Sequence, residues 1–136
     1  MFNKVEHIGI AINNLEESQE LFKKLFGKEA YKVEAVESEG VKTLFFQLGE
    51  TKIELLEASS PDSPIAKFLS KKGPGIHHIA FDVSDIESEI ARLKEEGFEV
   101  LNEKPKSGAD NKLVAFLHPK STNGVLVELC QEKPMS

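Results

Sequence analysis

The sequence contains an internal repeat, which limits the folds that it can adopt. His7–Glu16 align with His78–Glu87, and later Lys52–Leu56 align with Leu126–Cys130. Self-similarity of this kind marks a repeated supersecondary unit, because each copy needs its neighbour to bury an apolar face. Each half therefore carries one histidine near its start and one glutamate near its end.

The hydrophobic period changes in the same order within each half. Val5–Ile12 alternate as a β-strand, and the next segment has the spacing of an amphipathic helix with Asn14 as N-cap and Gly27 as stop. In the second half, Ser84 and Glu87 form a capping-box pattern. The strands predicted after the two helices are 30–36, 41–48 and 51–57 in the first half, and 99–102, 112–118 and 124–131 in the second. Both halves are thus predicted to be βαβββ.

The chain is predicted to be a single domain made of these two modules, at about 3–58 and 75–131. Its 136 residues are close to the commonest size of one domain. Ser63-Pro64 favours a short connecting helix at about 63–72, because proline is tolerated at the first helical position. Gly73-Pro74-Gly75 is expected to end this helix.

Composition and charge narrow the class of protein. Apolar residues form 40% of the chain and charged residues 29%, which is typical of a globular domain. The formal net charge of −6 argues against a nucleic-acid partner, which requires a concentrated basic face. No apolar run approaches the roughly 18 residues of a membrane span. Cys130 is the one cysteine, so an internal disulfide is excluded, and we expect a cytoplasmic protein.

Strand alternation turns the histidines and glutamates away from the predicted core faces. His7 lies opposite the isoleucines of its strand, and His78 lies opposite the large apolar residues of its own. By the same parity, Glu54 and Glu128 point away from their apolar neighbours. A carboxylate buried among apolar residues is costly unless it is paired, hydrogen-bonded or bound to a metal.

Two interpretations of this set remain open. The set consists of His7, Glu54, His78 and Glu128. Its mixed nitrogen and oxygen donors suit one divalent ion, of Co, Mn, Zn, Ni or Fe(II). In the alternative, the histidines make structural hydrogen bonds and the glutamates pair with lysines. Of the other histidines, His77 is predicted to be a buried structural residue, and His118 to be a loop residue or a group that supports a ligand.

The duplicated halves, with His and Glu at matching positions, resemble the vicinal oxygen chelate superfamily of glyoxalases, bleomycin resistance proteins and dioxygenases. Within it, the chain is most similar to methylmalonyl-CoA epimerases over nearly its whole length. The stretches that carry the resemblance are Glu6–Ala11, Lys52–Leu56, Asp62–Leu69, Gly75–Ala80, Phe116–Lys120 and Gly124–Leu129. The resemblance implies an α+β fold in which two tandem βαβββ modules form a curved mixed sheet around a metal cleft.

The resemblance also implies a ligand set and a reaction. The implied metal ligands are His7, His78 and Glu128, with Glu54 at a fourth position that varies between Gln and Glu. An acyl-CoA substrate would lose and regain its C2 proton through an enolate, which interconverts the R and S epimers. Glu128 is expected to be one acid/base. Some epimerases carry a second glutamate where this chain has Thr43, so the second acid/base is left unassigned. A homodimer is expected from the same resemblance.

Two other functions are compatible with this fold. Lactoylglutathione lyase (glyoxalase I) uses the same His/Glu pattern and the same enolate chemistry on a glutathione adduct. The sequence His118–Gly124 differs, however, from the Asp-Pro-Asp-Gly type common among glyoxalases. A non-catalytic binding protein is the alternative from another class, and the four ligand-type residues disfavour it.

Overall fold

The computed structural model describes residues 1–133. These residues form two compact units, a central unit of residues 7–77 and a split unit that combines residues 1–6 with those from 78 onward. Strands β1 (Phe2–Ala11) and β5 (Gly75–Val83) contribute to both units. Among the described residues, eight strands form a mixed sheet in the order β2-β3-β4-β1-β5-β8-β7-β6. The predicted α+β class and the repeated βαβββ order are confirmed.

The central unit packs one face of its strands on a helix. Besides β1, its strands are β2 (Lys32–Val36), β3 (Val41–Leu48) and β4 (Thr51–Ala58). β2, β3 and β4 are antiparallel neighbours, and β4 pairs with β1 in parallel. Helix α1 (Leu15–Phe26) begins after Asn14, whose side chain accepts a hydrogen bond from the Glu17 N–H, and ends at Gly27, as predicted. Its Phe22 and Phe26 side chains pack against a cluster that contains Ile12, Leu15, Leu44, Phe46 and Leu55.

The other face of the central unit carries helix α2 (Pro64–Lys72). The Ser63 hydroxyl caps this helix by accepting a hydrogen bond from the Ala66 N–H at 3.1 Å. Ile65 of α2 packs with Ala11 and Leu56. Because side chains alternate along a strand, these two residues share their face with the histidine of β1 and the glutamate of β4. The 3₁₀ turn η1 (Glu37–Glu39) joins β2 to β3.

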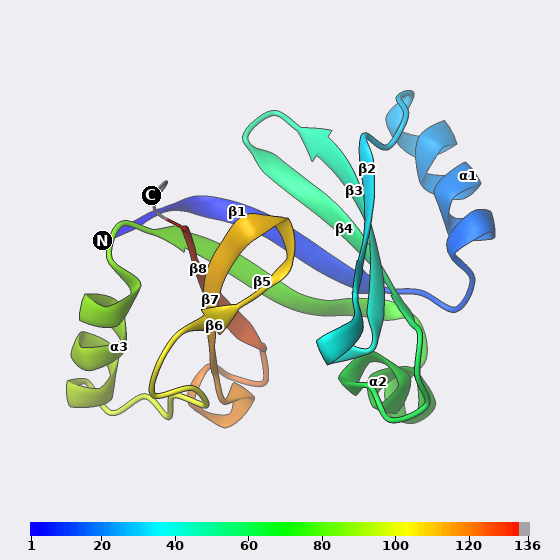
Figure 1. The fold of residues 1–136 in the computed structure, drawn as a ribbon. Helices are drawn as coiled ribbons and strands as arrows, with labels where there is room; N and C mark the ends of the chain where they lie inside the picture. Colours follow the sequence, from blue (N-terminus) through cyan, green and yellow to red (C-terminus); the bar gives the residue numbers. More distant parts are fainter. Residues whose placement is uncertain (134–136) are drawn as a thin grey trace. The chain divides into compact units, whose positions relative to one another are not determined.

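The split unit repeats this arrangement. Its remaining elements are α3 (Ile86–Glu95), β6 (Lys106–Ser107), η2 (Ala109–Asn111), β7 (Lys112–Leu117), η3 (Pro119–Ser121) and β8 (Val127–Glu132). β8 pairs with β5 in parallel and with β7 antiparallel. Helix α3 packs on β7 and β8 (Figure 1), where Ile86, Ile90 and Leu93 contact a cluster that includes Leu129. The opposite strand face holds a smaller cluster of Ala80, Val114, Cys130 and Phe116.

The start of α3 differs from the sequence prediction. Asp85 is the N-cap, because its carboxylate accepts a hydrogen bond from the Ser88 N–H at 3.2 Å. Ser84, the predicted cap, is instead hydrogen-bonded through its hydroxyl to the Asn3 side chain at 3.2 Å. The prediction was therefore wrong by one residue, since a contact with β1 occupies the serine.

The strand predicted at 99–102 is also wrong as a regular strand. Val100 makes only an isolated bridge to Leu117, and the ladder with β7 is made by β6 further along. The Asn102 side chain accepts the hydrogen bond of the Phe116 N–H at 2.9 Å, in place of a backbone carbonyl. A side chain that competes for a backbone donor interrupts a ladder, which explains the irregular segment.

No helix among the described residues is both long enough and apolar enough to cross a membrane.

Candidate active site

The central unit contains one buried histidine–glutamate pair. The Nδ1 atom of His7 on β1 lies 3.2 Å from an Oε atom of Glu54 on β4, and both side chains are at least nine-tenths buried. The pairing of β1 with β4 places Gly9, two residues after His7, opposite Glu54. This register and the absence of a side chain at Gly9 bring the imidazole and the carboxylate onto one face of neighbouring strands.

The split unit contains a second pair with the same construction. The Nε2 atom of His78 on β5 lies 3.1 Å from an Oε atom of Glu128 on β8, and both side chains are again buried. Here Ala80, two residues after His78, is the residue opposite Glu128. A histidine, a small residue two positions later and a glutamate opposite that residue thus recur in both units.

A phenylalanine stands across the antiparallel ladder from each glutamate. Phe45 on β3 is opposite Glu54, and Phe116 on β7 is opposite Glu128. The ring of Phe116 meets the His78 ring edge to face, with 6.1 Å between centroids. Apolar rings beside the polar pairs keep water away from them, which strengthens electrostatic interactions of the buried groups.

The donor atoms of each pair have the separation expected for neighbouring ligands of one cation. Two donors at about 2.1 Å from an ion and at right angles lie roughly 3 Å apart. An ordinary hydrogen bond between imidazole and carboxylate has a similar length, so each pair is also stable by itself. The imidazole nitrogens and carboxylate oxygens form the mixed donor set of borderline divalent metals. The residues present therefore fit a divalent ion.

Comparison with known proteins decides the family. Residues 6–116 match the Glyoxalase/Bleomycin resistance protein/Dioxygenase superfamily. A mitochondrial methylmalonyl-CoA epimerase of Dictyostelium discoideum is 47% identical over 128 residues, which are 93% of this chain and 76% of that protein. An ethylmalonyl-CoA/methylmalonyl-CoA epimerase of Cereibacter sphaeroides is 44% identical over 133 residues, which are 96% of this chain and 99% of that protein. The chain belongs to the methylmalonyl-CoA epimerase family of this superfamily.

Solved structures of this epimerase family agree with the fold. A methylmalonyl-CoA epimerase in complex with methylmalonyl-CoA and NH4+ is 33% identical, with a TM-score of 0.93 over 97% of this chain and 96% of that chain. A Streptomyces coelicolor methylmalonyl-CoA epimerase in complex with 2-nitronate-propionyl-CoA is also 33% identical, with the same TM-score and coverage.

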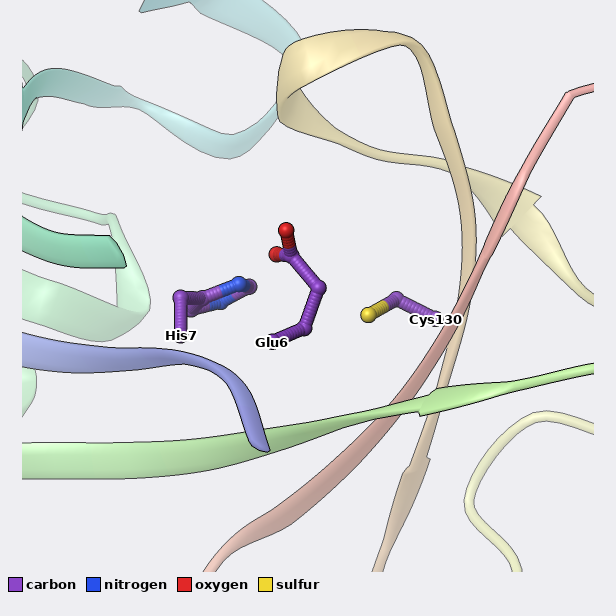
Figure 2. Close-up of side chains that lie close together, drawn as sticks. All are labelled: Glu6, His7 and Cys130. Atoms are coloured by element: carbon purple, nitrogen blue, oxygen red, sulfur yellow. The ribbon is translucent and has the colours of Figure 1, made fainter. Parts of the chain in front are cut away.

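A buried acidic residue next to His7 was missed by the sequence analysis. Glu6 is 4% exposed, and its carboxylate lies within 4.8 Å of the Cys130 thiol in the split unit. Figure 2 shows the Glu6 and Cys130 side chains close together. Burial raises the pKa of that thiol, and the negative charges of Glu128 and Glu6 raise it further. Glu6 and His7 are consecutive and both buried, so simple alternation could not reveal Glu6. The available signal was a carboxylate within an apolar strand, as at Glu54.

Thr43 stands on β3 at the position where some members of the epimerase family carry a glutamate. Its side chain is 1% exposed and lies on the same strand face as Phe45, two residues later. A hydroxyl in a fully buried position of this kind is neutral at any physiological pH, so Thr43 does not replace the missing carboxylate as a base.

The two remaining histidines differ from the buried pairs. His77 is only partly buried, so the prediction of a buried residue was wrong, and its ring packs edge to face on Phe68 of α2 with 5.0 Å between centroids. His118 precedes η3, where its Nδ1 accepts a hydrogen bond from the Lys120 N–H at 3.0 Å. Its position in a loop is as predicted.

Proposed function

We propose that this chain is a methylmalonyl-CoA epimerase, which interconverts the R and S epimers of its substrate by moving the proton at C2. The observation that carries the proposal is the buried His–Glu pair that recurs at the same register in both units of a chain of the epimerase family. A pair of imidazole and carboxylate in each repeat supplies both metal donors and proton carriers.

The metal centre of the proposal uses all four residues of the two pairs. They are His7, Glu54, His78 and Glu128. When bound there, one divalent ion of Co, Mn, Zn, Ni or Fe(II) supplies a positive charge that stabilises the enolate oxygen of the thioester. The contacting atoms of each histidine and the glutamate of its own unit lie within 3.2 Å, so the two donors of each pair are already neighbours. The rings of Phe45 and Phe116 keep water from the carboxylates.

Glu128 is the proposed base for one face of C2. Its carboxylate takes the C2 proton of one epimer, and a second group returns a proton from the opposite face. We assign Glu54 to this second role, because it holds in the central unit the position that Glu128 holds in the split unit. Thr43 leaves no carboxylate at the position of the second glutamate found in some epimerases.

The roles of the two glutamates can be distinguished by measuring exchange of the C2 proton in each epimer separately. In heavy water, each of the variants Glu54→Gln and Glu128→Gln is expected to lose C2 proton exchange mainly with one epimer. The epimer affected should differ between the two variants. Nuclear magnetic resonance of separately prepared R and S substrates measures this. Equal losses from both epimers in both variants would show that the glutamates only hold the metal.

The decisive test of the activity uses the unmodified, metal-loaded protein. We expect it to exchange the C2 proton of methylmalonyl-CoA for deuterium and to interconvert the epimers. Conversion of the methylglyoxal–glutathione adduct without exchange in methylmalonyl-CoA would assign the chain to lactoylglutathione lyase instead. If the protein bound acyl-CoA but catalysed neither reaction, the result would favour a non-catalytic binding protein. No feature of the described residues favours either alternative.

The proposal includes an acyl-CoA partner and a homodimer. Helix α1 exposes Leu21 and Leu25, with exposed fractions of 62% and 69%, on neighbouring turns of one helix face. Apolar residues exposed side by side are typical of surfaces that bind another protein. Light scattering at micromolar concentration should give twice the mass of the 15.1 kDa chain, and the monomer mass would contradict the homodimer.

A further inference from the structure

The first helix of each unit is attached to its sheet by the same hydrogen bond. The first residue of α1, Leu15, donates its backbone N–H to the Glu57 side chain on β4 at 2.8 Å. The first residue of α3, Ile86, donates its N–H to the Gln131 side chain on β8, also at 2.8 Å. Because this contact recurs, positions around it can be compared between the two units.

Two positions near this contact are apolar in the split unit and polar in the central unit. Ile90, the fifth residue of α3, is buried in an apolar cluster, and Leu113 on β7 packs against the same cluster. The equivalent residues are Gln19, the fifth residue of α1, and Lys42 on β3. Lys42 stands opposite the accepting glutamate, as Leu113 stands opposite the accepting glutamine. The central unit therefore replaces two core side chains with an amide and an ammonium group.

The polar side chains of the central unit border a cavity of about 490 Å³. Volumes of this size are typical of sites for small molecules. Besides Gln19 and Lys42, the wall includes Glu16, Val33 and Glu57. The unit that carries apolar residues at the equivalent positions uses them as core, so the cavity is a property that distinguishes the central unit from its repeat.

The cavity lies on the opposite strand face from the His7–Glu54 pair. Glu57 follows Glu54 by three residues on β4, so side-chain alternation turns the two carboxylates to opposite faces. Glu57 shares its face with Leu55, which belongs to the cluster against which α1 packs. A ligand in the cavity would therefore not contact the proposed catalytic glutamate.

The charged groups of the cavity do not neutralise one another. Within residues 1–133, no ion pair joins Lys42 to Glu57, although the two residues are opposite each other and the carboxylate instead accepts the α1 N–H. Glu16 adds a second, exposed carboxylate. One ammonium and two carboxylates complement a ligand that carries both signs of charge, through charge-assisted hydrogen bonds. Val33, which is 50% exposed, offers apolar contact beside them.

We propose that this cavity binds a small zwitterion, an α-amino acid with an aliphatic side chain. The ligand carboxylate meets the Lys42 ammonium and the Gln19 amide. The ligand ammonium group meets the carboxylates of Glu57 and Glu16, and its aliphatic group lies against Val33. The site is separate from the proposed metal centre, and the inference does not depend on the epimerase function.

The test uses L-valine and two analogues that each lack one charge. L-Valinamide lacks the carboxylate, and 3-methylbutanoate lacks the ammonium group. Binding to the zinc-loaded, isotope-labelled protein is followed by nuclear magnetic resonance. We expect L-valine to shift the amide signals of Gln19 and Glu57 and to bind about tenfold more tightly than either analogue, the change for one charged hydrogen bond. The equivalent signals of Ile90 and Gln131 should not move.

Variants of the cavity sharpen the test, with circular dichroism to show that each is folded. Lys42→Met should weaken L-valine binding by about tenfold and leave the affinity for L-valinamide unchanged. Gln19→Ile combined with Lys42→Leu introduces the split-unit residues and should remove binding. Lys24→Met is the matched control, because Lys24 is an exposed lysine of α1 outside the cavity wall, and it should change nothing.

Three results would overturn the proposal. The first is the absence of signal shifts with L-valine at millimolar concentration. The second is an unchanged affinity for L-valine in Lys42→Met. The third is a set of shifts confined to the surroundings of His7 and His78, which would show that L-valine only chelates the metal ion.

Discussion

Glu128 has two roles in the proposed reaction, and a single substitution tests the chemical one. Glu128→Gln keeps the shape of the side chain and its oxygen donor but removes the proton acceptor. We expect C2 exchange to fall by at least about 100-fold, the usual scale of a general acid/base contribution. Metal content measured by mass spectrometry separates this effect from loss of the ion. Exchange at the unmodified rate with metal retained would exclude Glu128 as the base.

The Cys130 thiol is expected to be inert in the folded protein. It is fully buried, and burial together with the charges of Glu128 and Glu6 raises its pKa, so little thiolate forms. A disulfide reagent at pH 8 should therefore label the native protein far more slowly than the urea-unfolded chain. Labelling at similar rates in both states would show that this strand face opens readily in solution.

At the scale of elements, Glu89 ties α3 to the start of the chain. The hydrogen bond from the N-terminal ammonium holds the pKa of the Glu89 carboxyl below its ordinary value, and Arg92 at 2.9 Å adds to this. A lowered pKa stabilises the fold above the range in which the unfolded carboxyl titrates, and the effect is lost as the pH falls through the folded pKa. Glu89→Gln should thus lower stability near neutral pH but have little effect in acid.

We expect Glu89→Gln to cost about 1–2 kcal/mol at pH 7, because Arg92 is half exposed and its charge is screened by salt. Urea unfolding curves at pH 7 and at pH 3 measure the difference. Glu87→Gln is a suitable control, since Glu87 is an exposed residue on the same helix. A difference that persists unchanged in acid would mean that packing, and not charge, is lost at Glu89.

Elements with strong local signals could be predicted from sequence, and elements set by distant contacts could not. Asn14 and Gly27 bound α1 because their hydrogen bonds and backbone angles are local. The start of α3 depends on a contact between Asn3 and Ser84, and the irregular segment before β6 depends on the Asn102 side chain at β7. Such contacts join residues far apart in sequence, so periodicity does not reveal them.

In the candidate site, too, local sequence patterns could be predicted and contacts between distant residues could not. The repeat and strand parity predicted the faces of His7, Glu54, His78 and Glu128, and the structure pairs each histidine with the glutamate of its own unit. Burial of Glu6 and the partial exposure of His77 depend on how neighbouring strands twist and pack, which no single segment encodes. Binding of one ion by both pairs stays a prediction, as do the module boundaries, the homodimer and the cytoplasmic location.

At the scale of the whole molecule, the path of β1 limits how the chain can be divided. Residues 1–6 belong to the split unit although the central unit follows them at once. A cut before Gly75 would therefore give a C-terminal fragment that lacks residues 1–6 of the split unit. The N-terminal fragment would keep residues 1–6 without the rest of that unit. We expect circular dichroism to show that each fragment alone is largely unfolded, and that mixing them restores the native spectrum. A native-like spectrum from residues 75–136 alone would contradict this.

The placement of residues 1–6 in the split unit also affects how such a chain can evolve. Residues 1–6 come from the first half of the sequence but belong to the unit that is otherwise built from the second half. Loss of the first half would therefore remove part of that second unit, and we expect the two halves to be inherited together.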